Sequence, residues 1–246
     1  MNILLTGGAG YIGSHVLLAL LDNGHSVSVI DDLSTGHKEL LPENIQFLEC
    51  NINNKNKIAS IIQQNSFDAL MHFAAFIKVE ESIKNPEKYF TNNTNNAINL
   101  FETCFENNLK NIIFSSTAAA YGNSEKNINI PETEKLQPLN PYGESKIKTE
   151  KFLFQNKDRF KFIILRYFNV AGADPALRTG LISKNTTHLI KITSEVAVGK
   201  REKITIFGND YNTPDKTAIR DYIHVSDLAD IHLLAMKYLI DNKKSN

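Results

Sequence analysis

Residues 6–13 read Thr-Gly-Gly-Ala-Gly-Tyr-Ile-Gly, which satisfies Gly-x-Gly-x-x-Gly from Gly8 and Gly-x-x-Gly-x-x-Gly from Gly7. An apolar run, Ile3-Leu4-Leu5, precedes this stretch, and a helical pattern follows it. Glycines permit a tight turn and a close approach of the backbone to a phosphate, while a helix N-terminus favours negative charge. The stretch therefore predicts a strand–turn–helix unit that holds a pyrophosphate.

Short apolar runs alternate with helical patterns along most of the chain. Nearly continuous apolar runs of this length are typical of strands buried on both faces. Their alternation with helices predicts βαβ units, and so an α/β fold with a doubly wound parallel Rossmann sheet. The expected strands cover residues 2–6, 26–31, 45–50, 69–74, 111–116 and 162–169, and the expected helices cover 12–23, 55–64, 86–107 and 142–156.

The pattern changes after residue 169. We expect residues 1–171 to form the Rossmann domain and residues 172–246 a small, incomplete lobe whose last helix returns to that domain. Ser226 is a candidate cap for this last helix. Within the lobe we expect a loop at 172–185, a helix at 186–198, strands at 203–207 and 223–225, a turn-rich stretch at 208–216 and the last helix at 227–240.

The composition limits the classes of function. The chain has 27 basic and 27 acidic residues, which argues against binding to nucleic acid or a membrane surface through bulk charge. No apolar run is long enough to span a membrane, and no basic leader follows Met1, so we expect a cytoplasmic protein. Cys50 and Cys104 are expected to be buried, reduced thiols. The seven histidines lack metal-ligand spacing, so no metal site is predicted.

The second predicted strand ends in an acid, Asp31, eighteen positions after Gly13 (31 − 13). A carboxylate at this place hydrogen-bonds the adenosine ribose hydroxyls and repels a 2′-phosphate. No arginine lies nearby to bind that phosphate, so NAD is favoured over NADP. A solvated turn is the alternative interpretation of Asp31 and Asp32.

Tyr142 and Lys146 form a Tyr-x-x-x-Lys motif, whose spacing allows the two side chains to act together in catalysis. On a helix these positions share a face, and a neighbouring ammonium together with a cationic nicotinamide ring would lower the pKa of Tyr142. Tyr142 then becomes a general base. The fifth predicted strand ends in Ser115-Ser116-Thr117, whose hydroxyls face the ligand crevice and can relay a proton. Surface packing of the Tyr/Lys pair, and a capped turn for two of the three hydroxyls, are the structural alternatives.

Longer segments identify a family. The sequence resembles the UDP-glucose 4-epimerases, which are extended short-chain dehydrogenases/reductases, over essentially the whole chain. The glycine and Tyr/Lys motifs belong to the superfamily, whereas Ile-Phe-Gly-Asn-Asp-Tyr at 206–211 and Arg-Asp-Tyr-Ile-His-Val at 220–225 are more specific to sugar-nucleotide 4-epimerases. The other matching segments are 6–15, 72–75, 114–122, 141–146, 165–169 and 226–229.

The resemblance implies NAD-dependent interconversion of UDP-glucose and UDP-galactose. Tyr142 would remove the proton of the sugar 4-hydroxyl with help from Thr117, and Lys146 would hold the nicotinamide ribose. Hydride would pass from sugar C4 to NAD and return to the other face of a rotated 4-keto sugar. A 4-epimerase of another UDP-sugar is the near alternative. A dehydratase is disfavoured because Thr117 is followed by two alanines instead of an acidic pair.

The resemblance also implies binding residues. Arg220 would contact the diphosphate, because guanidinium forks suit phosphate oxygens. As alternatives, Leu189 and Phe207 are core residues and Arg220 pairs with Asp221. The implied NAD contacts are Gly7, Gly10, Tyr11, Ile12, Gly13, Asp31, Asn51, Ile52, Phe73, Ala74, Asn92, Ser115, Tyr142, Lys146 and Phe168. The implied UDP-sugar contacts are Thr117, Tyr142, Asn169, His188, Leu189, Thr205, Ile206, Phe207 and Arg220.

Three features depart from the family pattern. Asn51 stands where an aspartate usually contacts adenine, and Ile77 stands where some members have a lysine. Members usually continue well beyond residue 246, so we expect a partial substrate-binding lobe and an uncovered sheet edge. An NAD-binding remnant or interaction scaffold without activity is therefore the alternative to an active enzyme. The family also implies a homodimer in which helices 86–107 and 142–156 pair.

Overall fold

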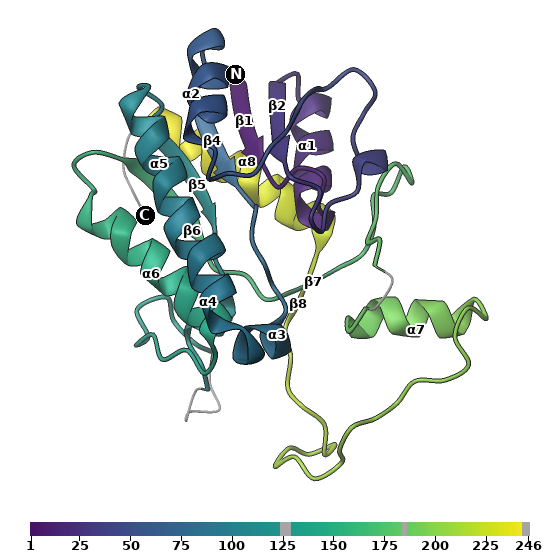
Figure 1. Cartoon of the computed structure of the whole chain (residues 1–246). Coiled ribbons are helices and arrows are strands. Elements are labelled where there is room, and N and C mark those ends of the chain that lie inside the picture. Colours follow the sequence, from purple (N-terminus) through teal and green to yellow (C-terminus); the bar gives the residue numbers. More distant parts are fainter. Residues whose placement is uncertain (124–128, 184–185, 243–246) are drawn as a thin grey trace.

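The computed structural model describes residues 1–123, 129–183 and 186–242. Its centre is a six-stranded, fully parallel sheet in the order β3-β2-β1-β4-β5-β6 (Figure 1). The direction of winding reverses between β1 and β4, which places a crevice at the carboxyl ends of these strands. This confirms the predicted doubly wound α/β fold. The strands are β1 (Asn2–Thr6), β2 (Ser26–Asp31), β3 (Gln46–Glu49), β4 (Ala69–His72), β5 (Asn111–Ser115) and β6 (Lys161–Leu165).

Helices cover both faces of the sheet and bury alternate strand residues, because successive side chains on a strand point to opposite faces. Leu4 and Ile112 pack with Phe101 on one face, while Ile3 and Ile113 lie in the core on the other face. The first face is covered by α2 (Lys55–Gln64), α5 (Ala97–Glu106) and α6 (Pro141–Gln155), and the second by α1 (Tyr11–Asp22) and α8 (Val225–Asn242).

The predicted helix 86–107 is a continuous helical rod with an irregular middle. It consists of α4 (Pro86–Tyr89), the π-helical segment η2 (Phe90–Asn96) and α5. Within η2, the Asn93 side chain accepts from the Phe76 amide and donates to the Phe76 carbonyl, both at 2.9 Å. Rods with such a bulge often occur at functional sites. The described part before β6 also contains three short helices, η1 (Lys38–Leu40), α3 (Val79–Lys84) and η3 (Ala118–Ala120).

The region after β6 departs from the sequence prediction. The expected strand 162–169 ends at Leu165, and the chain re-enters a sheet at β7 (Asn169–Ala171), which pairs in parallel with β8 (Tyr222–His224). The predicted strand at 203–207 is wrong. The described backbone there pairs with no other strand, and the side chains of these residues are exposed. Figure 1 shows α7 (Leu189–Ala197) standing away from the main sheet.

Several smaller expectations can be compared with the structure. Cys50 and Cys104 are buried free thiols, as predicted. Ser226 lies inside the first turn of α8, which begins at Val225, so its assignment as the cap is wrong. Lys184, Asn185 and residues 243–246 of the predicted loop and lobe lie outside the described residues. In the described part of the chain, no helix combines the length and apolarity needed to cross a membrane, and no cluster of potential metal ligands occurs.

Candidate active site

The predicted residues of the Rossmann part gather at one edge of the sheet. The glycine turn follows β1, and Asp31 ends β2. Because all six strands are parallel, the segments that follow them emerge at the same edge. The remaining predicted residues on this edge are Asn51 and Ile52 after β3, Phe73 and Ala74 after β4, Ser115 and Thr117 at the end of β5, and Phe168 after β6.

The glycine turn is packed so tightly that Gly7 and Gly13 leave no room for a side chain. Gly7 has a φ of +77°, and a Cβ there would lie 2.5 Å from the Ala74 nitrogen. A Cβ at Gly13 would lie 2.1 Å from the Gly7 carbonyl oxygen. Helix α1 starts after Gly10 with no side-chain cap and no acid in its first turn. Its first amides are therefore free to bind an anion, and the donor set fits the diphosphate of a dinucleotide.

Asp31 is a structural part of this turn as well as a candidate ribose ligand. Its carboxylate accepts from the Ala9 amide at 3.0 Å and from the Leu33 amide at 2.9 Å. The Asp31 side chain is buried, which raises its pKa, so the alternative of a solvated turn is wrong for Asp31, whereas Asp32 is exposed. Asn51 donates to Asp32 at 2.6 Å. An aspartate at residue 51 would repel Asp32, so the amide suits this chain.

The three predicted catalytic side chains come together. Tyr142 and Lys146 lie four residues apart on α6, whose first turn is capped by the side chain of Asn140. Tyr142 and Thr117 share a side-chain hydrogen bond. The ammonium of Lys146 is buried and donates to the Ser115 carbonyl at 2.8 Å. A hydroxyl, a phenol and an ammonium thus lie at one point of the crevice.

Burial dominates the protonation of this cluster in the protein alone. Burial raises the pKa of Tyr142, and the hydrogen bond from Thr117 only partly opposes that shift. In the protein without NAD, desolvation disfavours the phenolate more strongly than its neighbours favour it. The predicted lowering of the pKa of Tyr142 includes the charge of a bound nicotinamide ring and stays a prediction. Burial also lowers the pKa of Lys146 to about 7, against the opposing charge of Glu150. The side chain of Lys146 therefore titrates near neutral pH.

Tyr11 connects the cofactor turn to the second lobe. Its hydroxyl donates to the Gly172 carbonyl at 2.7 Å, and burial raises its pKa to about 12. Its ring packs with Ile12 against the small cluster of Val170, Val225 and Leu228. Asn92, in η2, donates to Asn93 at 3.1 Å. Tyr11 and Asn92, which are both predicted to contact NAD, therefore also form hydrogen bonds within the protein.

The predicted UDP-sugar residues of the second lobe lie on exposed segments. His188 precedes α7, and Leu189 begins it. Phe207 is 96% exposed and Leu189 is 52% exposed, so the alternative of core residues is wrong for both. Thr205 and Ile206 share the exposed irregular segment with Phe207.

Arg220 and Asn169 flank the start of β8. Arg220 donates to the Ile219 carbonyl at 2.7 Å, and Asn169 donates to the Asp221 carbonyl at 2.9 Å. Among the described residues no ion pair joins Arg220 to Asp221, so this alternative for Arg220 is not found. The guanidinium of Arg220 lies at the surface.

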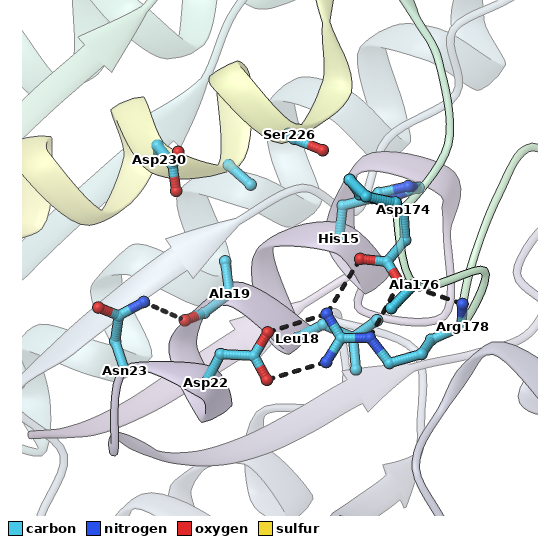
Figure 2. Close-up of a pocket in the computed structure, with 12 residues that line it drawn as sticks. His15, Leu18, Ala19, Asp22, Asn23, Asp174, Ala176, Arg178, Ser226 and Asp230 are labelled. Carbon is cyan, nitrogen blue, oxygen red and sulfur yellow. Dashed lines mark hydrogen bonds and ion pairs between the residues drawn. The ribbon is translucent and has the colours of Figure 1, made fainter.

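A cleft of about 290 Å³ lies elsewhere, between α1, α8 and the loop at 174–178 (Figure 2). Arg178 crosses it and donates to both carboxylate oxygens of Asp22 at 2.8 Å and to Asp174 at 2.9 and 3.0 Å. The described residues that line the cleft include none of the predicted site residues. This ion pair network therefore fastens the loop after β7 to α1, apart from the candidate site.

Comparison with known proteins identifies the family. Residues 3–245 match the NAD dependent epimerase/dehydratase family. The chain is 48% identical to the UDP-glucose 4-epimerase of Azospirillum brasilense over 240 residues, which cover 97% of this chain and 69% of that protein. The chain belongs to this family. The resemblance seen in the motifs is therefore confirmed.

Solved structures of family members superpose on the chain. The UDP-glucose 4-epimerase from Brucella ovis in complex with NAD is 38% identical, with a TM-score of 0.94 over 100% of this chain and 75% of that one. The UDP-Glc/GlcNAc 4-epimerase of Campylobacter jejuni is 45% identical, with a TM-score of 0.83 over 100% of this chain and 76% of that one.

Two groups of side chains around the site were missed by the sequence analysis. Asn93 donates to the Ser145 hydroxyl at 3.2 Å, so η2 holds α6 directly beside Lys146. Tyr167 shares a hydrogen bond with Ser115. The run Asn92-Asn93-Thr94-Asn95-Asn96 inside a predicted helix was a usable signal for the first group, because helix interiors disfavour asparagine. Tyr167 had no comparable signal.

Proposed function

We propose that the chain binds NAD and interconverts UDP-glucose and UDP-galactose by hydride transfer at sugar C4. The convergence of Tyr142, Thr117 and Lys146 beside the glycine turn carries the proposal. Membership of the family, together with relatives that are UDP-glucose 4-epimerases, supports this assignment.

Each catalytic side chain has a distinct role in the proposed reaction. Tyr142 removes the proton of the sugar 4-hydroxyl, and Thr117, hydrogen-bonded to it, relays and returns that proton. Lys146, with a pKa of about 7, carries positive charge for part of the time and favours the phenolate form of Tyr142, which must be present before the sugar proton is transferred to it. The positive charge of bound NAD would act in the same direction. When bound, NAD supplies the hydride acceptor at C4. Burial of Lys146 strengthens its effect, because charges interact more strongly away from water.

The binding residues are proposed together with this chemistry. The free amides at the start of α1 hold the diphosphate, and Asp31 accepts from the ribose hydroxyls. Arg220, exposed at the start of β8, binds the diphosphate of the UDP-sugar. The other NAD and UDP-sugar contacts inferred from the family, the division of the chain at residue 171 and the cytoplasmic location stay predictions.

Turnover and cofactor binding test the proposal separately. The purified chain is incubated with UDP-galactose and NAD, and the formation of UDP-glucose is followed. Tyr142→Phe should reduce turnover by about 100- to 10,000-fold, because it removes the proton acceptor. Its effect on NAD affinity should be much smaller, because the phenol is one of many predicted NAD contacts. Tyr238→Phe, on the outer side of α8, is the matched control. NAD binding without turnover by the parent chain would instead favour an inactive remnant.

A second UDP-sugar is a candidate substrate because the Campylobacter jejuni relative is named as a UDP-Glc/GlcNAc 4-epimerase. The same assay with UDP-N-acetylglucosamine decides between the two. Turnover of the acetylated sugar at least equal to that of UDP-galactose would overturn the first choice.

We also propose that the chain forms a homodimer through the faces of α5 and α6. Phe154, on α6, is 50% exposed, which is consistent with an apolar contact at this surface. Light scattering at micromolar concentration provides the test. A monomeric mass would refute the proposal, and Phe154→Glu should shift a dimer toward monomer.

A further inference from the structure

Three residues of α6 meet three consecutive residues at the end of β5. Positions four apart share one face of a helix, so one side of α6 runs along the whole segment 115–117. Two of the three contacts belong to the catalytic cluster, and the third has no role in the chemistry proposed above. The contacts are Tyr142 with Thr117, Lys146 with Ser115 and Glu150 with Ser116.

Glu150 is a fully enclosed carboxylate. Its side chain is 1% exposed. The guanidinium of Arg166 grips it, with Nε donating to both oxygens at 3.0 and 3.1 Å and Nη2 donating at 2.6 Å. The Ser116 hydroxyl donates to the same carboxylate. A buried charge is costly unless it is paired and hydrogen-bonded, and Glu150 has both kinds of partner.

Backbone hydrogen bonds hold the segment that Glu150 touches from the side of β6. The Ser116 amide donates to the Leu165 carbonyl, and the Ala118 amide donates to the Tyr167 carbonyl, both at 2.9 Å. These bonds come from β6 and the residues after it. The side chain of Glu150 supplies an anchor from the helix side.

We propose that Glu150 is a positioning residue for the reaction proposed above, on which this inference rests. Clamped by Arg166, it fixes Ser116 and thereby the strand end that presents a carbonyl to Lys146 and a hydroxyl to Tyr142. It also places a negative charge one helical turn from the Lys146 ammonium. The clamp thus sets both the geometry and the charge of the catalytic cluster.

The charged and titratable groups around Lys146 support the second effect. Tyr142 and Glu150 lie on the same helix, His72 lies on β4, and Tyr167 contacts Ser115 from the segment after β6. Burial lowers the pKa of His72 to about 3 and raises the pKa of both tyrosines, so these three groups are neutral at pH 7. Glu150 is therefore the anion of this set that favours the protonated form of Lys146.

The first test is independent of turnover. The pKa of Lys146 is measured in the full chain by NMR with 13C-labelled lysine, and Lys146→Met is used only to assign the signal. Glu150→Gln keeps the shape and removes the charge, so the pKa of Lys146 should fall by about 1. The control is Glu144→Gln, an exposed glutamate on the same helix that pairs with Lys148 at 3.1 Å. An unchanged pKa in Glu150→Gln overturns the charge effect.

The second test separates position from charge. Ser116→Ala breaks the link to the strand end while Glu150 keeps Arg166. It should lower kcat for UDP-galactose by about tenfold through misplacement of the cluster, with KM and the pKa of Lys146 unchanged. In Glu150→Gln the pH profile of kcat should move with that pKa. Parent-like kcat and pH profile in both variants would overturn the inference while leaving the proposed function intact. If the parent has no turnover, the proposed function fails and the pKa of Lys146 alone decides the role of Glu150.

Discussion

Replacing Gly13 with alanine probes the packing of the phosphate-binding turn. The added Cβ would lie 2.1 Å from the Gly7 carbonyl oxygen and 2.9 Å from the Gly8 Cα. Ordinary contact begins at 3.4 Å, so the turn and the helix must separate by about 1.3 Å (3.4 − 2.1). Both atoms belong to the backbone, so no side-chain rotation relieves the overlap.

The expected loss is larger for the cofactor than for the fold. Overpacking of this kind costs about 1–3 kcal/mol, and alanine regains about 1 kcal/mol over glycine inside a helix. The net loss in the free energy of unfolding is then about 0–2 kcal/mol. The amides displaced are the ones proposed to bind the diphosphate, and a shift of about 1 Å costs on the order of 100-fold. The dissociation constant for NAD should therefore rise by about 10- to 100-fold.

Gly24→Ala is the matched control for this substitution. Gly24 has a positive φ, +75°, which Gly13 does not, and a Cβ at Gly24 has no neighbour within 4 Å. Alanine in a left-handed conformation costs about 1 kcal/mol, without any change at the turn. Calorimetric titration with NAD and thermal unfolding of both variants give the comparison. The reasoning is refuted if Gly13→Ala binds NAD as tightly as Gly24→Ala.

Two further predictions concern stability. Phe101, fully buried against His72 and Phe114, should cost about 3–5 kcal/mol when replaced by alanine, measured by urea unfolding; a loss below about 1 kcal/mol would contradict the packing described. Hydrogen bonds from Arg178 hold the pKa of Asp174 at about 2, below its usual 3.8. A lowered carboxyl pKa stabilises the fold above the unfolded value and loses that contribution as the pH falls to the folded value. The advantage of the parent over Arg178→Met should thus shrink between pH 5 and pH 2, and a constant difference would exclude this linkage.

The Rossmann part could be predicted because local and global signals agree there. The run that ends at Asp31 carries Val27, Val29 and Ile30, and the structure buries β2 on both faces from Val27 onward. The turn at Gly7–Gly13 needs backbone conformations and close contacts that few residues other than glycine allow. The spacing of these glycines between a strand and a helix therefore predicts the shape of the turn. Tyr142 and Lys146 follow from helical periodicity, and Thr117 from its place after a strand.

The parts that were missed depend on contacts between distant segments. Polar and apolar residues alternate at 203–206, as they do in a half-buried strand. This pattern does not supply the neighbouring strand with which a β-strand must form hydrogen bonds. Glu150 looks in the sequence like one of many helix-surface glutamates. Its burial arises from Ser116 and Arg166, which directly follow β5 and β6. The π-helical segment arises because Asn93 binds the backbone of Phe76, a pairing that periodicity does not encode.

The short pairing of β7 with β8 brings together the two ends of the segment 172–221, so the length of this segment can vary. The chain leaves the body at Ala171 and returns at Tyr222, and three residue pairs hold the two points together. Doubling the length of such an excursion costs only about 0.6 kcal/mol in closure entropy. Insertions and deletions beyond the loop at 174–178, which Arg178 fastens to α1, would leave α8 packed on α1. Evolution can therefore remodel what this lobe recognises while the machinery that handles hydride and proton stays unaltered.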